Sequence, residues 1–542
     1  MEREPNLRLA KKQPDHIMVS IFADPASSMA VTWRTSEDIQ DGFVEFYEEG
    51  KTEKFTVKAV TKPFKSDVNT SSIHFARLEN LKSGTKYYYT CGNNEYRSDE
   101  FYFETAEENL THFKFIAISD HQKEDDHYDP SYMQLNAFLK KVLEENPDVK
   151  FILTAGDNCN CGQHEIQWNA MFEGLEGIIE HLPYMMTCGN HDNRGFRQYF
   201  PTEVERYYAE PAEFFNTQFE LSYPKNGPEG WQTENYSFDY GNAHFNVFGV
   251  NEPELVNDWA KDDIENCGKT WKFGTYHFPI YYSGPNLSND DGYPMLRESF
   301  EKTDVIFSGH EHNFSRSYPI RNEELFDRPS QGTIHYELAN GNFNPPGTKT
   351  CDKVWHCSFY PDEEKRAAYA LIEIDGNKAK FTSRLDDGRV IDECIIDKDK
   401  DEILPRRIAP VFGPGRTRTY FKGVDLGLAM SEIPPENKDG IWYFPAGTLV
   451  SIIGGDVLRE KDKITLAVYG KKAVFRQGEN TADTNKGEVA LEGAVYRGNG
   501  SQLYIPLDSF CKIFGMKWAY AKRNNFLTIE TADESHPIPT QP

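Results

Sequence analysis

Hydrophobic and polar positions alternate through the first hundred residues of the chain. Segments 29–33, 43–47 and 86–90 each switch between apolar and polar side chains at every step. That period-two pattern is typical of strands with one buried face. Turn residues at Asp41-Gly42 and in segment 92–94 separate these strands. The pattern predicts a β-sandwich at the start of the chain and shows no catalytic cluster in it.

A different pattern begins near Thr111. Segment 113–118 is a continuous apolar strand, and segment 151–154 is another. Between them, residues 133–146 place apolar side chains on one face of a helix, which Pro147 ends. The apolar helix positions are Leu135, Phe138, Leu139, Val142 and Leu143. Strand–helix–strand order predicts an α/β unit, in which ligands bind beyond the carboxyl edge of the sheet.

Apolar strands of this unit are followed by side chains that can bind metals. Segments 183–187, 271–276 and 304–307 repeat the strand pattern seen at 113–118 and 151–154. The residues that follow the strands are, in order, Asp120, Asp157, Asn190 with His191, His277, and His310 with His312. A single His-x-His pair at the end of a strand, such as His310 and His312, is more often solvated or hydrogen-bonded than metal-bound. Five strands with the same ending are hard to explain by core packing, and they predict a metal site.

The last part of the chain is predicted to be a separate small module. A Pro/Gly/Arg-bearing connector runs through residues 405–416. Segments 448–453, 463–468 and 489–495 are predicted as strands, and segment 503–515 as a strand, a short helix and a glycine cap. The module has no histidine before the C-terminal tail. We therefore expect binding or anchoring there, and not catalysis.

Composition excludes several classes of protein. The formal net charge of -27 argues against binding to a nucleic-acid backbone, because a broad basic surface is missing. No apolar run approaches a membrane span, and the first residues lack a signal-peptide hydrophobic region. The nine cysteines are too sparse for a disulfide scaffold, although Cys351 and Cys357 could close a loop.

The ordered motifs resemble those of the calcineurin-like metallophosphoesterases. With a fibronectin-type sandwich in front and segment 315–320 behind the last histidine, the chain is similar to the purple acid phosphatase branch. Segment 504–529 resembles the amine-oxidase N-terminal-like modules of Gram-positive extracellular proteins, a likeness that implies neither copper nor oxidase activity. The resulting division is 1–107 β-sandwich, 108–400 α/β metallophosphoesterase with two central sheets flanked by helices, 401–435 linker, 436–533 small α+β module, and 534–542 tail.

The resemblance implies a centre of two metal ions. Asp157 would bridge both ions, with Asp120 and His312 completing one shell. The other shell would be formed by Asn190, His277 and His310. Oxygen and imidazole ligands suit iron, manganese or zinc. A hydroxide held between the ions would attack phosphorus in line, with His191 hydrogen-bonding either a phosphoryl oxygen or the nucleophile.

The sequence departs from the resembled family at three places. Asn160 stands where the purple enzymes have a metal-binding tyrosine, so we expect no purple colour and a weaker preference for ferric ion. For Asn160 itself, a metal-ligand role or a contact behind the ligands is open. Gln122 stands where many relatives have a histidine, and a metal-ligand role or a contact behind the ligands is equally open. Segment 281–286 lacks the histidines found in plant and animal enzymes, which leaves activated monoesters, diesters or nucleotides as substrates.

Alternatives accompany these expectations. Asp192 is interpreted as structural, Arg316 as orienting its loop, His121 as pointing away from the site, and segment 340–344 as a turn. The rival function is a surface or cell-wall binding protein with a degenerate metal site. An amine oxidase is rejected, because the last module lacks a three-histidine copper set. We expect an extracellular or cell-surface location, with a cytoplasmic one left open, and a final module that binds a cell surface or another protein.

Overall fold

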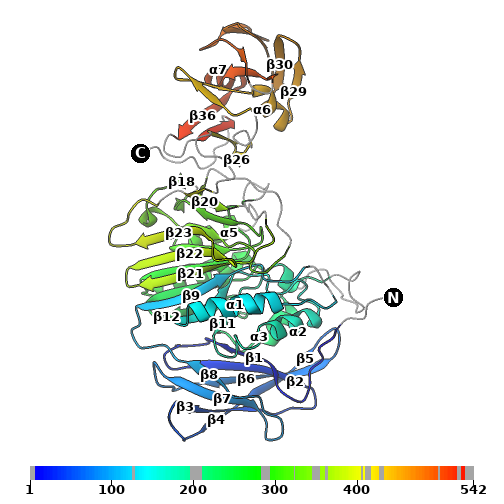
Figure 1. Ribbon diagram of the computed structural model, residues 1–542, viewed down its shortest axis with the longest axis vertical. Helices are drawn as coiled ribbons and strands as arrows, with labels where there is room; N and C mark the ends of the chain where they lie inside the picture. Colours follow the sequence, from blue (N-terminus) through cyan, green and yellow to red (C-terminus); the bar gives the residue numbers. More distant parts are fainter. Residues whose placement is uncertain are drawn as a thin grey trace.

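The computed structural model places three regions along the long axis of the molecule: a β-sandwich at one end, a two-sheet unit in the middle and a small module at the other end (Figure 1). The structure describes residues 6–124, 128–195, 210–281, 283, 293–322, 324–344, 355–360, 364–404, 407–408, 417–426, 433–498, 501–521 and 526–531. The tail 534–542 and Cys351, with its suggested loop to Cys357, lie outside these residues.

The N-terminal sandwich consists of two four-stranded sheets. One sheet has the order β1 (Asp15–Ser20), β2 (Met29–Ser36), β6 (Thr70–Leu78) and β5 (Val60–Lys65). The other has the order β4 (Phe55–Lys58), β3 (Phe43–Glu48), β7 (Lys86–Gly92) and β8 (Phe101–Glu104). Alternate side chains of β3 and β7 are buried, as the period-two pattern predicted.

The middle unit contains two larger sheets. The first has the order β11 (Tyr184–Met185), β10 (Val149–Thr154), β9 (His112–Ile118), β21 (Ala368–Asp375), β22 (Lys378–Leu385) and β23 (Val390–Asp397). The second has the order β12 (Tyr236–Tyr240), β13 (Ala243–Phe248), β14 (Trp271–Tyr276), β15 (Val305–Ser308), β19 (Ile334–Glu337), β16 (Phe314–Ser317), β20 (His356–Tyr360) and β24 (Arg407–Ile408). A separate hairpin joins β17 (Ile320–Arg321) to β18 (Glu324–Leu325).

Helices cover these sheets. They are α1 (Met133–Glu145), α2 (Glu165–Gly174), α3 (Glu213–Phe219), α4 (Pro253–Asn266) and α5 (Tyr293–Phe300), with 3-10 turns η1 (His191–Asn193) and η3 (Pro329–Gln331). Helix α1 matches the predicted segment 133–146 to within one residue, because its apolar stripe is buried. The α/β fold with two sheets and flanking helices, preceded by a β-sandwich, is thereby confirmed.

The parallel strands place their carboxyl ends at common edges. β9, β10 and β11 run parallel in the first sheet, and β13, β14, β15 and β19 run parallel in the second. The hydroxyls of Thr187 and Thr275 lie 2.8 Å apart and link the region after β11 to β14. Loops after strands of both sheets therefore meet in one place, as the α/β topology requires.

A buried ion-pair network joins the sandwich to the middle unit. Arg34 on β2 is 1% exposed and binds Glu165 at the start of α2, with 2.7 Å between Nη1 and Oε1. Its other nitrogens bind Asp15 and the backbone carbonyl of Arg8. Loss of one partner would leave a buried charge without compensation, so this network fixes the two regions relative to each other.

The last module has its own hydrophobic core. Its three sheets have the orders β26 (Val424–Asp425), β25 (Arg418–Phe421), β37 (Phe526–Thr531), β36 (Met516–Ala521); β27 (Glu436–Lys438), β28 (Ile441–Phe444), β35 (Leu503–Pro506), β34 (Tyr496–Arg497); and β29 (Asp456–Arg459), β30 (Lys463–Val468), β31 (Lys471–Arg476), β32 (Thr481–Thr484), β33 (Gly487–Ala490). The predicted linker 401–435 contributes strands to both the middle unit and the last module, because β24 pairs with β20 and β25 pairs with β37.

Two secondary-structure predictions for the last module need correction. Segment 448–453 was predicted as a strand, but it lies largely in helix α6 (Ala446–Ile452). Ala446, Leu449 and Val450 are buried at helical spacing while Ile452 is 54% exposed, so tertiary packing decides an ambiguous apolar run. The predicted strand 489–495 ends at Ala490. Segment 503–515 is confirmed as β35, helix α7 (Leu507–Phe514) and the left-handed cap Gly515.

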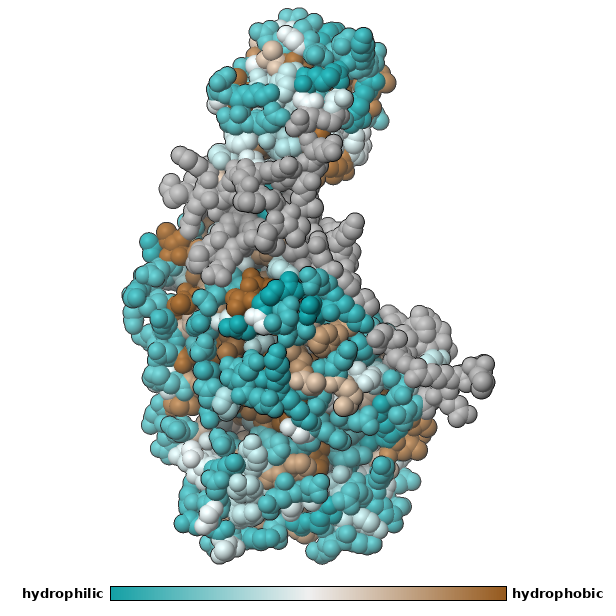
Figure 2. All heavy atoms as spheres, in the orientation of Figure 1, coloured by the Kyte–Doolittle hydropathy of each residue, from teal (hydrophilic) through white to brown (hydrophobic). Residues whose placement is uncertain are grey.

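The surface is mainly hydrophilic. In Figure 2 hydrophobic residues on the visible face occur singly or in small groups among hydrophilic ones. Large exposed apolar side chains are scattered over all three regions, with Phe55 in the sandwich and Leu458 in the last module as examples. Among the described residues, none of the helices has the length and apolar character needed to cross a membrane.

Candidate metal centre

Five loops at the carboxyl ends of strands bring the predicted site residues together. Asp120 follows β9, Asp157 follows β10, His277 follows β14, and His310 and His312 follow β15. Asn190 and His191 come from the loop after β11, where η1 begins. All seven of these side chains belong to residues that are buried or nearly so.

Asp157 lies at the centre of this cluster. Its Oδ2 lies 3.1 Å from His277 Nε2 and 3.6 Å from His191 Nε2, while its Oδ1 accepts a 2.9 Å hydrogen bond from the backbone N–H of His191. Burial alone would raise the pKa of Asp157, but His191 and His277 hold it below its ordinary value. The carboxylate is therefore ionised and faces two imidazole rings.

The His277 ring fits a metal ligand. Its Nδ1 lies 2.8 Å from the carbonyl oxygen of Ala155, which can only accept, so Nδ1 carries the ring proton. Its Nε2 is buried, has no hydrogen-bond partner and faces Asp157. Burial lowers the pKa of His277, but the carboxylates of Asp157 and Asp120 raise it to about 9. An imidazole nitrogen and a carboxylate oxygen therefore face each other, an arrangement that suits either a proton or a bound cation.

Ligand atoms of Asp157, His277 and His310 lie within 4.8 Å of one another. His310 Nδ1 also lies 3.2 Å from Asn190 Oδ1, so the asparagine joins this group. One carboxylate, one amide oxygen and two imidazoles form a donor set suited to transition metals.

Asp120 and His312 form a second group beside the first. His312 Nε2 lies 3.4 Å from Asp120 Oδ1, and the backbone N–H of His310 donates to both carboxylate oxygens of Asp120 at 2.9 Å. Burial lowers the pKa of His312, but Asp120 raises it to about 9. The contacts therefore link Asp157, Asn190, His277 and His310 in one group, and Asp120 with His312 in another.

Four of the candidate ligand positions have a strained backbone. Asp120, Asp157, His310 and His312 have φ angles of 51°, 54°, 74° and 59°, in the left-handed region that non-glycine residues rarely adopt. Each such residue costs about 1–2 kcal/mol, and strain of this kind gathers at functional sites.

Glycines beside the ligands permit close approach of the loops. A Cβ on Gly189 would lie 2.3 Å from Asp157 Oδ1, and one on Gly309 would lie 2.2 Å from Asp120 Oδ2. A Cβ on Gly156 would lie 2.5 Å from His277 Nδ1. The glycines that precede Asp157, Asn190 and His310 are thus required by packing against the site itself.

Asn160 does not face the candidate metal ligands. Its Oδ1 lies 2.8 Å from His191 Nδ1 and 3.0 Å from Arg194 Nη2. Burial lowers the pKa of His191 to about 3, Asp157 opposes this shift and Arg194 adds to it. Of the two roles left open for Asn160, the geometry favours a contact behind the ligands. Arg194, three residues after His191, was missed because its sequence position gives no indication of this contact.

Gln122 lies next to His312. Its Nε2 is 3.5 Å from His312 Nε2 and 3.2 Å from Glu124 Oε1, while its Oε1 is buried without a hydrogen-bond partner. Rotation of the amide would present this oxygen to the Asp120–His312 group. Both roles considered for Gln122 therefore remain compatible with its position.

Neighbouring polar residues hold the loops in place. Asp192 accepts hydrogen bonds from the backbone of Asn158, Cys159 and Gly189 and from the Asn158 side chain. The turn 340–344 binds the 119–124 loop, with Asn342 Nδ2 on the His121 carbonyl and Asn344 Nδ2 on the Gln122 carbonyl. The side chain of His121 bonds Tyr184 at 2.7 Å and not the ligands.

Arg316 binds protein and not the site. Its guanidinium makes two bonds to Asp392, at 2.7 and 3.0 Å, and both side chains are buried. Ser283, in the segment 281–286 that lacks histidine, donates to Glu337. Residues 282 and 284–286 of that segment lie outside the described residues.

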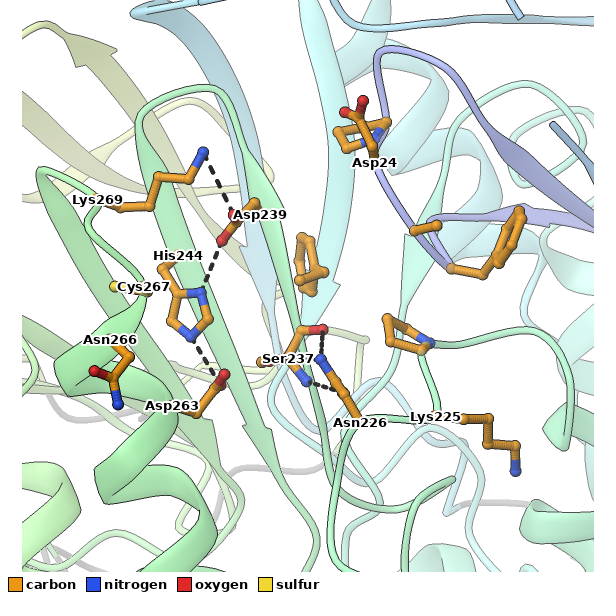
Figure 3. Close-up of a pocket in the computed structure, with 15 residues that line it drawn as sticks. Asp24, Lys225, Asn226, Ser237, Asp239, His244, Asp263, Asn266, Cys267 and Lys269 are labelled. Carbon is orange, nitrogen blue, oxygen red and sulfur yellow. Dashed lines mark hydrogen bonds and ion pairs between the residues drawn. The ribbon is translucent and has the colours of Figure 1, made fainter. Parts of the chain in front are cut away.

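A cavity lies away from these residues. A space of about 650 Å³ opens between the sandwich loop at Phe22–Pro25 and the β12–β13–α4 region (Figure 3). Inside it, His244 bridges Asp239 and Asp263 at 2.8 and 3.0 Å, and Lys269 approaches Asp239. None of the predicted site residues lines this cavity.

Two family models match the chain. Residues 14–105 match the model described as purple acid phosphatase, N-terminal domain. Residues 113–314 match the model described as calcineurin-like phosphoesterase. The second match includes every candidate ligand from Asp120 to His312.

Several purple acid phosphatases are similar to part of this chain. The probable inactive purple acid phosphatase 1 of Arabidopsis thaliana is 25% identical over 378 residues, covering 61% of this chain and 59% of that protein. Purple acid phosphatase 21 of the same plant is 26% identical over 332 residues, covering 58% and 69%. The chain thus spans less than two thirds of the first relative. A purple acid phosphatase structure from yellow lupin (Lupinus luteus) seeds shares the fold, with a TM-score of 0.58, 18% identity and coverage of 71% and 74%.

Proposed function

The chain carries a calcineurin-like phosphoesterase domain behind a purple acid phosphatase N-terminal domain, and from this premise we propose that it is a phosphoester hydrolase dependent on two metal ions. The observation that carries the proposal is the position of Asp157. Its carboxylate lies 3.1 Å from His277 Nε2 in the His277–His310–Asn190 group, and its charge also acts on Asp120 and His312 in the other group. A carboxylate so placed offers one oxygen to each of two cations.

In this proposal each group of ligands holds one ion. Asn190, His277, His310 and Asp157 would hold one ion, and Asp120, His312 and Asp157 would hold the other, with Gln122 adjacent to His312. Nitrogen and oxygen donors of this kind suit iron, manganese or zinc. When bound, two such cations lower the pKa of a shared water and neutralise charge on a phosphoryl group.

The protein residues contribute positioning and proton handling. The backbone N–H of His191 fixes Asp157, and that of His310 fixes Asp120, so both carboxylates are oriented before any ligand binds. His191 places Nε2 beside Asp157 at the edge of the cluster, where it can bind the attacking water. Phosphorus is then attacked directly by water.

A covalent phosphocysteine intermediate is disfavoured. Burial raises the pKa of Cys159 and Cys188 well above the ordinary value, and it raises that of Cys161 to about 12. These are the cysteines in the loops after β10 and β11. Thiols held neutral are poor nucleophiles, so direct attack by water is the simpler route.

The rival function is a binding protein with a degenerate site. The name of one relative, a probable inactive purple acid phosphatase, and the departures at Gln122 and Asn160 favour it. The strained backbone of the buried residues Asp120 and Asp157, and the contact of Asp157 with His277, oppose it, because selection for fold alone would not require this cost.

Metal content and turnover measured together test the proposal. We expect about two ions per chain, and metal-dependent hydrolysis of p-nitrophenyl phosphate or its bis-ester. Both should be lost in Asp157→Asn and His310→Ala. His112→Ala is the matched control, because that exposed histidine lies at the opposite end of β9 from Asp120. Folded protein with no metal and no turnover after reconstitution with manganese, zinc or iron would favour the binding protein.

We further propose an extracellular or cell-surface location, with the last module, residues 436–533, binding a surface or another protein. The support is its separate core, which lets it fold beside the phosphoesterase without contributing to the site. Cell fractionation tests the location. Sedimentation with cell walls, compared between the full chain and a chain ending after Leu404, tests the binding.

A further inference from the structure

Asn160 contacts one edge of the His191 ring, and Arg194 binds Asn160. The Asn160 side-chain oxygen lies 2.8 Å from His191 Nδ1, and its backbone oxygen lies 3.1 Å from the same nitrogen. Arg194 binds the same two oxygens, with Nη2 at 3.0 Å and Nε at 3.2 Å. The guanidinium fork and the imidazole therefore share a pair of acceptor atoms.

This arrangement determines which ring nitrogen carries the proton. A backbone carbonyl can only accept, and the orientation of the Asn160 amide is fixed because Arg194, which only donates, contacts its Oδ1. His191 Nδ1 consequently donates to both oxygens. In the neutral ring Nε2 then has a lone pair, and Nε2 is the nitrogen that lies 3.6 Å from Asp157 Oδ2.

We propose that Asn160 and Arg194 are positioning residues for His191, holding its proton on Nδ1 and directing the Nε2 lone pair into the metal centre. The group that binds Nε2 must then be a hydrogen-bond donor. Given the proposed function, on which this identification rests, the donor is the attacking water and not an unprotonated phosphoryl oxygen. This chooses between the two partners that the sequence left open for His191.

A purely structural role for the contact is the competing explanation, since it joins the loop after Asp157 to the loop after Asn190. Those loops are also joined by other bonds. The Gly162 N–H donates to the His191 carbonyl at 2.8 Å, and Gln163 Nε2 donates to the Asn193 carbonyl at 3.0 Å. Loss of the Asn160 side chain should therefore change the ring more than the loops.

The direct test is nitrogen NMR of the zinc-loaded and metal-free full chain with ¹⁵N-labelled histidine, using His191→Gln to assign the signals. We expect the wild type to carry its proton on Nδ1 in both states. Asn160→Leu should mix the tautomers, and Asn160→Asp, which keeps an acceptor, should restore Nδ1–H. A wild-type ring with its proton on Nε2 would overturn the proposal, whether or not the protein hydrolyses esters.

Kinetics provide the second readout. In Asn160→Leu and Arg194→Met we expect kcat to fall about 10- to 100-fold while KM and metal content stay near wild type, as for other residues that orient a catalytic histidine. Gln163→Leu is the matched control, because it cuts a bond between the same loops without touching His191. An equal fall in kcat in that control, with an unchanged tautomer in Asn160→Leu, would show a structural role only. Absence of turnover in the wild type contradicts the proposed function, while the tautomer result still decides the positioning role.

Discussion

His277 Nε2 lies 3.1 Å from Asp157 Oδ2, and both residues are buried. The other ring nitrogen, Nδ1, carries a proton that it donates to the Ala155 carbonyl. A lone pair and a carboxylate oxygen face each other without a proton between them unless the ring is doubly protonated. Either an extra proton or a metal ion must occupy this place, and the two compete.

The first prediction concerns this competition. Zinc or manganese should bind more weakly as pH falls below about 9, because the pKa of His277 is raised to about 9 and below that pH a proton must be displaced from the ring. In His277→Ala the metal content should drop by about one ion per chain, with hydrolysis reduced at least about 100-fold. Elemental analysis after dialysis at several pH values, with His112→Ala as control, measures this. Full metal content in His277→Ala would remove His277 from the ligand set.

The second prediction concerns Gly309. In Gly309→Ala the new Cβ would overlap Ser119 and Asp120, so the loop that carries His310 must move. We expect weaker metal binding and a loss of activity of about 100-fold. Gly376→Ala is the control, because nothing lies within 4 Å of its Cβ and only the left-handed backbone, about 1 kcal/mol, opposes it. Equal metal affinities in the two variants would contradict the packing argument.

The third prediction concerns colour. Asn160 binds His191 and Arg194, so iron bound at this centre has no tyrosinate ligand from that position. The iron-loaded protein should lack the charge-transfer band that gives purple enzymes their colour. Absorption spectra of iron-loaded and zinc-loaded samples, matched for metal content, check this. A strong visible band present only with iron would mean that another tyrosine reaches the metal.

Sequence patterns predicted the elements, and the gathering of the candidate ligands, more successfully than the contacts behind them. Segment 271–276 matches β14, in which the aromatic residues Trp271, Phe273 and Tyr276 are buried and favour a strand. Segment 448–453 failed because a short apolar run fits a strand or a buried helix face equally well. The orientation of Asn160 toward His191 could not be predicted, since the direction of a loop side chain depends on a second loop, after β11, that is distant in the sequence. The same reason explains why Arg194 was missed.

The fourth prediction concerns Arg316, which follows the last histidine motif. Arg316→Leu leaves Asp392 buried without its partner and should cost about 3–5 kcal/mol of folding stability. Arg316→Leu with Asp392→Leu should recover part of that loss. Because Arg316 does not face the ligands, KM of the folded protein should not change. Denaturant titration and steady-state kinetics measure the two quantities, and a raised KM without lost stability would indicate contact with substrate.

The last prediction concerns His244 in the cavity of Figure 3. Asp239 on β12 and Asp263 on α4 each bind one ring nitrogen, and although burial lowers the pKa of His244, these two carboxylates raise it to about 9. An unfolded histidine has an ordinary value of about 6.5. A group whose pKa is higher in the folded state stabilises the protein fully below the unfolded value and loses that effect as pH rises. The stabilisation is therefore complete below pH about 6.5 and disappears toward pH 9, with a maximum of about 3 kcal/mol.

His244→Gln should remove part of this pH dependence, because His277 and His312, whose pKa values are also raised to about 9, contribute the rest. In metal-free protein, which excludes the effect of metal binding, the urea midpoint of the wild type should fall between pH 6.5 and 9, while that of the variant should fall by less. His112→Gln, at an exposed ion pair with Asp375, should behave as the wild type. An identical slope in His244→Gln and wild type would show that other groups set the pH dependence. His244 would then have to be neutral at pH 7, although each of its ring nitrogens lies within hydrogen-bond distance of a carboxylate oxygen.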